Sequence, residues 1–277
     1  MSAQRWTRDR RLRPGLGLVF ACCWFASLTT SPASSDLPAA DERVWHEFLE
    51  WFAVQPPKSD PRELVGNYRN ELIRRGTQAA TADQQMSIVW KLVFRRPEGV
   101  KLLWNKVYAG DKPIFSEKPT ALLVEAVQSR TPGSALDVGM GQGRNSLFLA
   151  LAKWKVTGFD PSDEGLRQAR DNAKRLGVDV ETVNTTDDQF DFGRNRWDLI
   201  VMTYVRSLSP ADAERFWDAL KPGGILVYEN GADPDNQVLK AFVRFRILRW
   251  EDVMESGDWN RNTKTRIQRL IAEKSAP

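Results

Sequence analysis

The chain has 277 residues, a formal net charge of +4, 42% hydrophobic residues and only two cysteines. The first 33 residues contain five arginines and one aspartate, so they carry the whole net charge and the remainder is close to neutral. This remainder has no Lys/Arg run interleaved with aromatics, which argues against nucleic acid as a partner. Both cysteines, Cys22 and Cys23, lie near the N-terminus. The rest of the chain therefore has no disulfide, no thiolate nucleophile and no cysteine metal ligand.

Residues 1–33 are typical of a signal peptide or signal anchor. Arg5 to Arg13 is basic, Leu16 to Leu28 is apolar, and Ser31-Pro32-Ala33 offers a small-x-small cleavage site. The apolar run is shorter than the roughly 20 residues of a membrane span. We expect an exported or membrane-anchored protein that contacts a membrane only through this segment, if it stays uncleaved. A cytoplasmic enzyme is expected instead if the segment is an anchor or the start codon is misassigned.

The stretch Ala135 to Asn145 predicts a buried strand, a glycine-rich turn and a helix. An apolar run ends at Asp137, and three glycines then alternate with other residues. Glycine tolerates positive φ and lets a ligand approach the backbone, and the following helix N-terminus offers unpaired N–H groups. The stretch therefore predicts a nucleotide- or nucleoside-binding loop after a first parallel strand, with a generic tight turn as the alternative.

Alternating strand and helix patterns follow this turn. Lys155 to Asp160 reads as a strand whose final acid lies about 20 residues after Asp137, the spacing of a ribose-binding carboxylate. A helix cap or turn residue before Pro161 is the alternative role for Asp160. A helix follows, with Leu166, Ala169, Ala173 and Leu176 on one face, and then a strand from Asp179 to Asn184.

The second half of the chain continues the α/β pattern. Trp197 to Thr203 is an apolar run typical of a strand that is covered on both faces. Ser209-Pro210 begins a helix that carries Phe216, Trp217 and Leu220. The remaining strand patterns are Ile225 to Glu229, Phe245 to Val253, and Thr265 to Glu273.

Two motifs carry a family resemblance. The spacing of Gly139, Gly141 and Gly143 is G-x-G-x-G, not the dinucleotide pattern G-x-G-x-x-G, and resembles motif I of the class I S-adenosylmethionine (SAM)-dependent methyltransferases. Gly141 to Leu147 is similar to the small-molecule, tellurite-resistance-type branch. Leu220 to Val227 (LKPGGILV) is similar to the segment before the fifth strand of this class.

For residues 119–277, the resemblance implies a Rossmann-like α/β domain: a seven-stranded class I methyltransferase sheet with helices on both faces and one antiparallel strand. It implies SAM as the cofactor and in-line methyl transfer from the sulfonium to a small-molecule acceptor. The alternative is a non-catalytic or repurposed SAM-fold binding module. The glycine spacing argues against a nicotinamide-dependent oxidoreductase.

The same resemblance implies a set of cofactor-binding residues at the carboxyl ends of the first strands. They are Asp137, Gly139, Met140, Gly141, Gly143, Asn145, Asp160, Pro161, Asp187, Asp188 and Thr203. One of Asp187 and Asp188 is expected near the adenine amino group, and the sequence does not separate them.

The candidate catalytic residues follow the fourth strand. Tyr204 is expected to orient a nucleophile and Arg206 to clamp an anionic substrate through its planar guanidinium. The alternative for Arg206 is a cap on the sheet edge or an ion pair with an acid. Arg144 is expected to shape the loop. The single histidine, His46, is expected to be a partly buried structural residue, so no histidine metal site is predicted.

Residues 34–118 are predicted to form a helical N-terminal extension and lid. Helical patterns cover Asp41 to Val54, Asp60 to about Arg75 and Thr81 to Arg95, and another begins at Pro97. The stretch Tyr108 to Phe115 is the predicted linker, which we expect to fold over the cofactor site. The extension would then shape a substrate pocket and exclude water.

Overall fold

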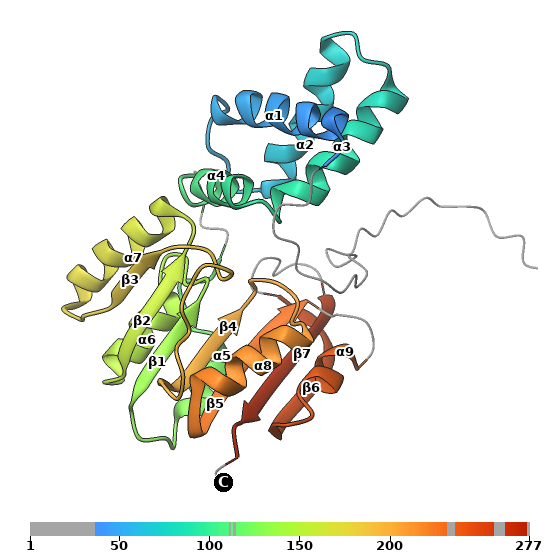
Figure 1. The fold of residues 1–277 in the computed structure, drawn as a ribbon. Helices are drawn as coiled ribbons and strands as arrows, with labels where there is room; N and C mark the ends of the chain where they lie inside the picture. Colours follow the sequence, from blue (N-terminus) through green and yellow to red (C-terminus); the bar gives the residue numbers. More distant parts are fainter. Residues whose placement is uncertain (1–36, 111, 113–114, 232–235, 258–263, 276–277) are drawn as a thin grey trace, which may run out of the picture.

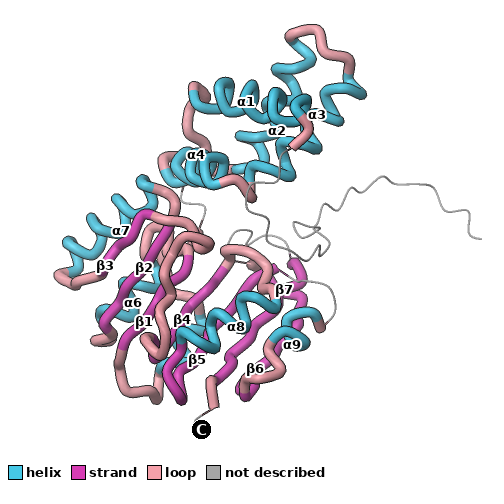
Figure 2. Tube along the Cα trace, in the orientation of Figure 1, coloured by secondary structure: helices cyan, strands magenta, loops and turns pink. Residues whose placement is uncertain are grey.

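The computed structural model describes residues 37–110, 112, 115–231, 236–257 and 264–275. The predicted signal segment lies outside these residues, as do three positions of the predicted linker, Asp111, Pro113 and Ile114. Figure 1 shows a helical unit placed over one end of an α/β unit. Figure 2 shows the strands of the α/β unit side by side, with helices packed against them.

Four helices form the N-terminal unit. They are α1 (Ala39–Ala53), α2 (Pro61–Arg74), α3 (Ala79–Val93) and α4 (Pro97–Tyr108). Proline at the first position begins α2 and α4, and the Asp60 side chain accepts hydrogen bonds from the first backbone N–H groups of α2. Trp45, Phe48 and Phe52 recur at helical spacing on α1 and are fully buried, so the unit has an aromatic core of its own.

The sheet has the strand order β3-β2-β1-β4-β5-β7-β6. Its strands are β1 (Ser134–Val138), β2 (Lys155–Asp160), β3 (Glu181–Asn184), β4 (Trp197–Thr203), β5 (Leu220–Gly231), β6 (Arg246–Ser256) and β7 (Lys264–Glu273). The first five strands are parallel, and β7 runs antiparallel between β5 and β6. The strand order reverses at β1 and β4. In such sheets ligands bind outside the carboxyl ends of the strands at this switch point.

Helices cover both faces of the sheet, which confirms the predicted Rossmann-like fold. They are α5 (Ala121–Val127), α6 (Arg144–Leu151), α7 (Asp163–Leu176), α8 (Pro210–Ala219) and α9 (Gln237–Ala241). Leu123 of α5 and Leu149 of α6 share one buried cluster with Val201 of β4. Phe216 of α8 packs in a separate cluster with Met202, the next residue of the same strand. Because successive strand side chains point to opposite faces, α5 and α6 lie on the opposite side of the sheet from α8.

The structure departs from the sequence prediction at several points. The short helices α5 and α9 were not predicted. Leu220, predicted to lie on the preceding helix, is the first residue of β5. Leu176, predicted on the apolar face of α7, is 43% exposed because it lies in the last turn, beyond the buried residues of that helix. Within the described residues, no helix is both long and apolar enough to span a bilayer.

Candidate active site

The glycine-rich loop between β1 and α6 has the conformation that its sequence predicts. Gly139, Gly141 and Gly143 have φ values of +63°, +52° and +86°, and Gly143 is the N-cap residue of α6. A Cβ on Gly141 would lie 2.1 Å from Tyr108 Oη, so a larger residue does not fit there without a shift. The Met140 side chain is buried against α7, which leaves only its backbone to face a ligand.

Two buried aspartates flank the loop. Asp160, the last residue of β2, accepts hydrogen bonds from Gly141 N at 2.9 Å and Ser162 N at 2.8 Å. Asp137 Oδ2 accepts one from Ser146 Oγ at 2.7 Å. Burial raises the pKa of each aspartate to about 6, and the hydrogen bonds only partly offset it. The two carboxyl groups therefore lie beside the loop in surroundings that disfavour their charge. A ligand with N–H, O–H or positive charge would stabilise their ionised form.

Asn145 and Thr203 connect the loop to the next strand. Asn145 Nδ2 donates to Thr203 Oγ1 at 3.0 Å, and Asn145 Oδ1 accepts from Thr120 N at the same distance. Asn145 is buried, so it acts as a bridge between α6, β4 and the start of α5. The predicted loop-shaping residue Arg144 lies with its guanidinium 5.8 Å from the ring of Tyr204.

The two candidate adenine ligands have different surroundings. Asp187 is bound by Arg206 Nε at 2.6 Å, whereas Asp188 is exposed. Beside them, Thr186 Oγ1 is buried and has no hydrogen-bond partner among the described residues. The carbonyl oxygen of Pro161 accepts a hydrogen bond from Asn184 Nδ2 at 3.0 Å, which connects the end of β2 to the end of β3. Asp188 and Thr186 therefore keep hydrogen-bonding capacity for a ligand.

Arg206 is bound by two protein carboxylates. Besides Asp187, it contacts both carboxylate oxygens of Asp212, at 2.8 and 2.7 Å, and Asp212 is 1% exposed. Burial would raise the pKa of Asp212, but the hydrogen bonds and charge of Arg206 outweigh it and hold that pKa below its ordinary value. The guanidinium thus forms the ion pair that was the alternative to a substrate clamp.

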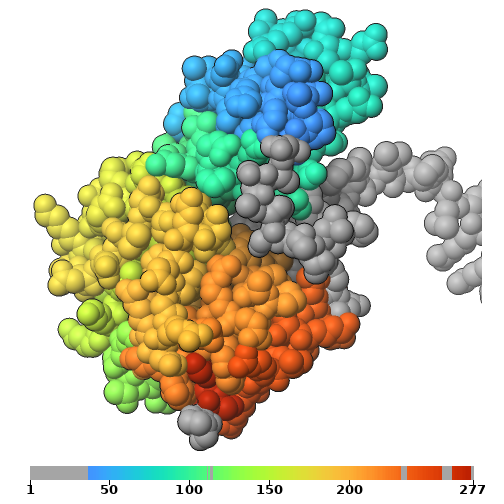
Figure 3. All heavy atoms as spheres, in the orientation of Figure 1, coloured from blue at the N-terminus to red at the C-terminus, as the bar shows by residue number. Residues whose placement is uncertain are grey.

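Helix α4 of the N-terminal unit lies directly on the site. Figure 3 shows the green segment around residue 100 against the yellow surface of α7. Asn105 Oδ1 accepts from Ser162 Oγ at 2.8 Å and from Glu164 N at 3.1 Å, at the N-terminus of α7. Gln168 Nε2 donates to the Tyr108 carbonyl at 2.8 Å. Burial and the nearby charge of Asp160 raise the pKa of Tyr108 well above its ordinary value.

Asn105 and Tyr108 are the contacts that sequence reasoning missed. Tyr108 was placed only at the start of the linker, and Asn105 was not singled out. The available signal was the apolar stripe of α4, which ends directly before the linker. The centroid of its Trp104 ring lies 6.1 Å from that of Tyr108, and the Phe115 ring lies 6.3 Å from Tyr108. These three rings form an aromatic cluster at the C-terminal end of α4.

The single histidine, His46, lies on α1 of the N-terminal unit. His46 is exposed on α1, where its Nδ1 lies 2.7 Å from the carbonyl oxygen of Glu42. The expectation that it is partly buried is therefore wrong, because the buried stripe of α1 passes through its neighbour Trp45 instead. Across the part of the chain that the structure describes, no three His, Cys, Asp or Glu side chains are grouped closely enough to hold a metal ion.

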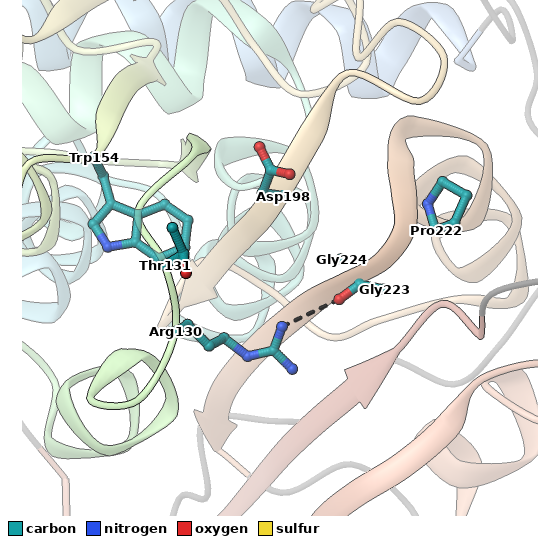
Figure 4. Close-up of a pocket in the computed structure, with 7 residues that line it drawn as sticks. All are labelled: Arg130, Thr131, Trp154, Asp198, Pro222, Gly223 and Gly224. Atoms are coloured by element: carbon teal, nitrogen blue, oxygen red, sulfur yellow. Dashed lines mark hydrogen bonds between the residues drawn. The ribbon is translucent and has the colours of Figure 1, made fainter.

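A pocket of about 250 Å³ lies at the opposite edge of the sheet (Figure 4). It is lined by Arg130, Thr131, Trp154, Asp198, Pro222, Gly223 and Gly224. Its polar groups already have protein partners: Arg130 donates to the Gly223 carbonyl at 3.1 Å, and Asp198 accepts from Ser134 N at 2.7 Å and Lys221 Nζ at 2.6 Å. This pocket is at the amino end of β4, away from the glycine-rich loop.

Comparisons with known proteins agree on the α/β unit. Residues 135–224 match the family described as a methyltransferase domain. A protein-L-isoaspartate O-methyltransferase of Xanthomonas euvesicatoria is 33% identical over 130 residues, covering 45% of this chain and 53% of that protein. The probable S-adenosyl-L-methionine-dependent methyltransferase TehB of Haemophilus influenzae is 30% identical over 103 residues, covering 35% of this chain and 36% of TehB. The chain thus spans about half or less of the length of these relatives.

A solved structure described as the conversion of a disulfide bond into a thioacetal group during echinomycin biosynthesis shares the fold. It aligns with a TM-score of 0.52 at 17% identity, covering 65% of this chain and 93% of that one. The strand order, the glycine-rich loop and the family match over residues 135–224 together support a class I SAM-dependent methyltransferase domain in the α/β unit, similar to the TehB type.

Proposed function

We propose that this protein transfers a methyl group from SAM to a small-molecule acceptor. The observation that carries the proposal is the packing of α4 on the glycine-rich loop and on the N-terminus of α7. This packing covers the cofactor edge of the sheet with a helical unit, which favours a small acceptor over an extended surface. A covered site also excludes water from the reacting groups.

The residues at this edge fit SAM. The carboxylate of Asp160 has further lone pairs for ribose hydroxyls beyond the two backbone N–H groups it binds. Asp188, which is exposed, would accept a hydrogen bond from the adenine amino group, and the Thr186 hydroxyl is a buried group whose hydrogen bond a ligand would complete. SAM, when bound, supplies a methyl group on a positively charged sulfonium. The protein itself orients the acceptor and keeps water away.

A SAM-fold binding module without transfer activity is the second candidate. It is favoured by the Tyr108 side chain, which lies against Gly141 of the loop, where a bound cofactor would have to approach the backbone. Calorimetry on the full chain, with SAM, S-adenosylhomocysteine and NAD, is the first test. The proposal requires micromolar SAM affinity, no NAD binding, and a methylated product in an acceptor screen. SAM binding without any product would favour the binding module, and a folded protein that binds NAD instead would overturn both candidates.

Replacing Asp160 by Ala is expected to weaken SAM binding by about 1–3 kcal/mol, or roughly 5- to 150-fold in Kd, because charge-assisted hydrogen bonds are lost. Asp198→Ala is the matched control. Asp198 also binds a backbone N–H, but it lies at the amino end of β4. Calorimetry should show unchanged SAM affinity for the control. Equal affinities for wild type and Asp160→Ala would refute the ribose assignment.

SAM affinity is expected to fall below about pH 6. Asp137 and Asp160 have pKa values raised to about 6, so at pH 5 each is mostly protonated and no longer attracts donors or positive charge. If only the ionised forms bind, Kd rises roughly tenfold per group between pH 7 and pH 5. Calorimetry from pH 5 to pH 8 measures this change, and a constant Kd over that range contradicts it.

Melting of the unliganded protein separates this effect from unfolding. Because both pKa values are raised on folding, the folded state binds more protons between about pH 4 and pH 6. The contribution of these two groups to stability is therefore greatest at low pH and is lost as the pH rises through 6. A melting temperature that holds at pH 5 while SAM affinity falls assigns the loss to the site.

A further inference from the structure

The ring of Tyr108, on α4, lies between two glycines of the α/β unit. A Cβ on Gly141, in the glycine-rich loop, would lie 2.1 Å from Tyr108 Oη. A Cβ on Gly165, in the first turn of α7, would lie 3.0 Å from Tyr108 Cδ2. Glycine is an unfavourable residue inside a helix, but at Gly165 it leaves the room that the ring occupies. The two glycines therefore form a slot that fits the ring.

Three residues of α4 hold the ring in this slot. Lys101, Asn105 and Tyr108 recur at helical spacing, so they lie on one face of α4, and we call them the docking stripe. Lys101 Nζ lies 2.8 Å from Asp163 Oδ2, and Gln168 Nε2 donates to the Tyr108 carbonyl at 2.8 Å. Asn105 accepts two hydrogen bonds at the N-terminus of α7. The docking stripe thus ties α4 to the helix that forms one wall of the slot.

The contact between the two units is polar apart from the Tyr108 ring, whereas the helical unit has an apolar core of its own. Leu103 and Val107 of α4 are buried in that core. The ion pair of the docking stripe joins side chains that are 45% and 58% exposed, so it adds little to the stability of the docked state. A unit with its own core and a polar interface can move relative to its neighbour as one body.

The slot lies where a cofactor would have to approach the glycine-rich loop. A glycine brings a ligand close to the backbone because it has no Cβ, and at Gly141 the side left open is covered by the Tyr108 phenol. The backbone N–H of the same glycine is bound by Asp160, the expected ribose ligand. A ligand that reaches Gly141 from this side would therefore displace the phenol.

We propose that Tyr108 is a plug that holds the cofactor site closed, and that cofactor binding requires α4 to release α7. The proposal rests on the proposed methyltransferase function and adds a regulation to its site. In the closed state the ring fills the slot. In the open state the docking stripe is detached and the cofactor replaces the phenol at Gly141. The measured dissociation constant is then that of the open state divided by the fraction of protein that is open.

The sign of this coupling separates a plug from a lid that closes over a bound cofactor. For a plug, each contact of the docking stripe favours the closed state and weakens cofactor binding. For a closing lid, the same contacts would strengthen it. Substitutions that loosen α4 therefore raise the affinity in one case and lower it in the other.

The first test measures the affinity for S-adenosylhomocysteine by calorimetry on the full chain. Tyr108→Ala should bind about tenfold more tightly than wild type, or more, because the plug is gone. Tyr108→Phe should lie between the two, since it removes only Oη, the atom closest to a Cβ added on Gly141. Asn105→Ala keeps the ring but loses two hydrogen bonds with α7, so it should bind about three- to tenfold more tightly.

Arg69→Ala is the matched control. Arg69 Nε donates to Asp83 at 2.6 Å between α2 and α3, so this substitution removes a polar contact that stays within the helical unit. It should keep the affinity of wild type. Melting curves show which variants are folded, and if Tyr108→Ala does not fold, Asn105→Ala tests the same coupling.

Hydrogen exchange of wild type gives a second readout that needs no substitution. Backbone amides of α4 and of the first turn of α7 should exchange faster when S-adenosylhomocysteine is bound. Slower exchange there overturns the plug, as does a folded Tyr108→Ala or Asn105→Ala protein that binds no more tightly than wild type. If wild type and the variants are folded and none of them binds S-adenosylhomocysteine or SAM, the proposed function fails and the plug fails with it.

Discussion

Replacing Gly141 by Ala is expected to weaken SAM binding more than 100-fold, roughly 3 kcal/mol. At φ = +52° an alanine carries about 1–2 kcal/mol of backbone strain. Its Cβ would also lie 2.1 Å from Tyr108 Oη and 2.8 Å from Tyr108 Cζ, so the loop or α4 must move. A displaced loop also loses the hydrogen bond between Gly141 N and Asp160, which holds the expected ribose ligand in place. Calorimetric titration with SAM measures the loss.

Gly177→Ala is the control that separates the effect of backbone strain from the effect of the clash with Tyr108. Gly177 has a similar φ of +66° at the end of α7, but nothing lies within 4 Å of a Cβ added there. Both variants should lower the melting temperature through strain, and only Gly141→Ala should lose SAM affinity. Adding Tyr108→Ala to Gly141→Ala removes the clash and should recover part of the affinity. Wild-type affinity in Gly141→Ala would show that Tyr108 and the loop do not share the cofactor space.

The elements predicted from sequence are those with strong local patterns. The buried strands β1 and β4 are apolar apart from a few polar residues, and the helices α2 and α4 have clear periodicity with proline at their first position. The two helices that were not predicted, α5 and α9, have only seven and five residues, too few to establish a period of 3.6. Leu220 was misplaced because its strand character comes from pairing with Trp197, a tertiary contact.

In the candidate site, too, the residues with local sequence patterns were predicted and those that depend on tertiary contacts were not. The glycine spacing and the acid at the end of β2 are local features, and they placed the loop and Asp160 from sequence alone. The partner of each remaining side chain comes from a distant part of the chain. That Tyr108 faces Gly141 depends on how α4 docks on the α/β unit, and that Arg269 pairs with Glu229 depends on the register of β7. Neither relation has a signature in a single sequence.

Replacing Arg206 by Ala is expected to destabilise the protein by about 2–4 kcal/mol, which lowers the melting temperature by roughly 5–10 °C. The substitution leaves Asp212, with 1% of its side chain exposed, without the positive charge that compensates it. The loss of stability is smaller than the full cost of an unpaired buried charge for two reasons. Arg206 is 38% exposed, and Asp212 keeps its hydrogen bonds from Ser209 N and Oγ. Thermal melting followed by circular dichroism measures the shift.

A second substitution shows that the loss comes from the ion pair. Adding Asp212→Asn to Arg206→Ala removes the uncompensated charge, so the double variant should be less destabilised than the sum of the two single variants. Because Arg206 holds the pKa of Asp212 below its ordinary value, the pair stabilises the fold above about pH 4 and loses its effect as the pH falls further. The difference in melting temperature between wild type and Arg206→Ala should therefore shrink at pH 3.

The control is Arg194→Ala, which removes an exposed ion pair with Asp218 and should leave the melting temperature unchanged. A stable Arg206→Ala protein that has lost only acceptor binding would instead assign Arg206 to the substrate.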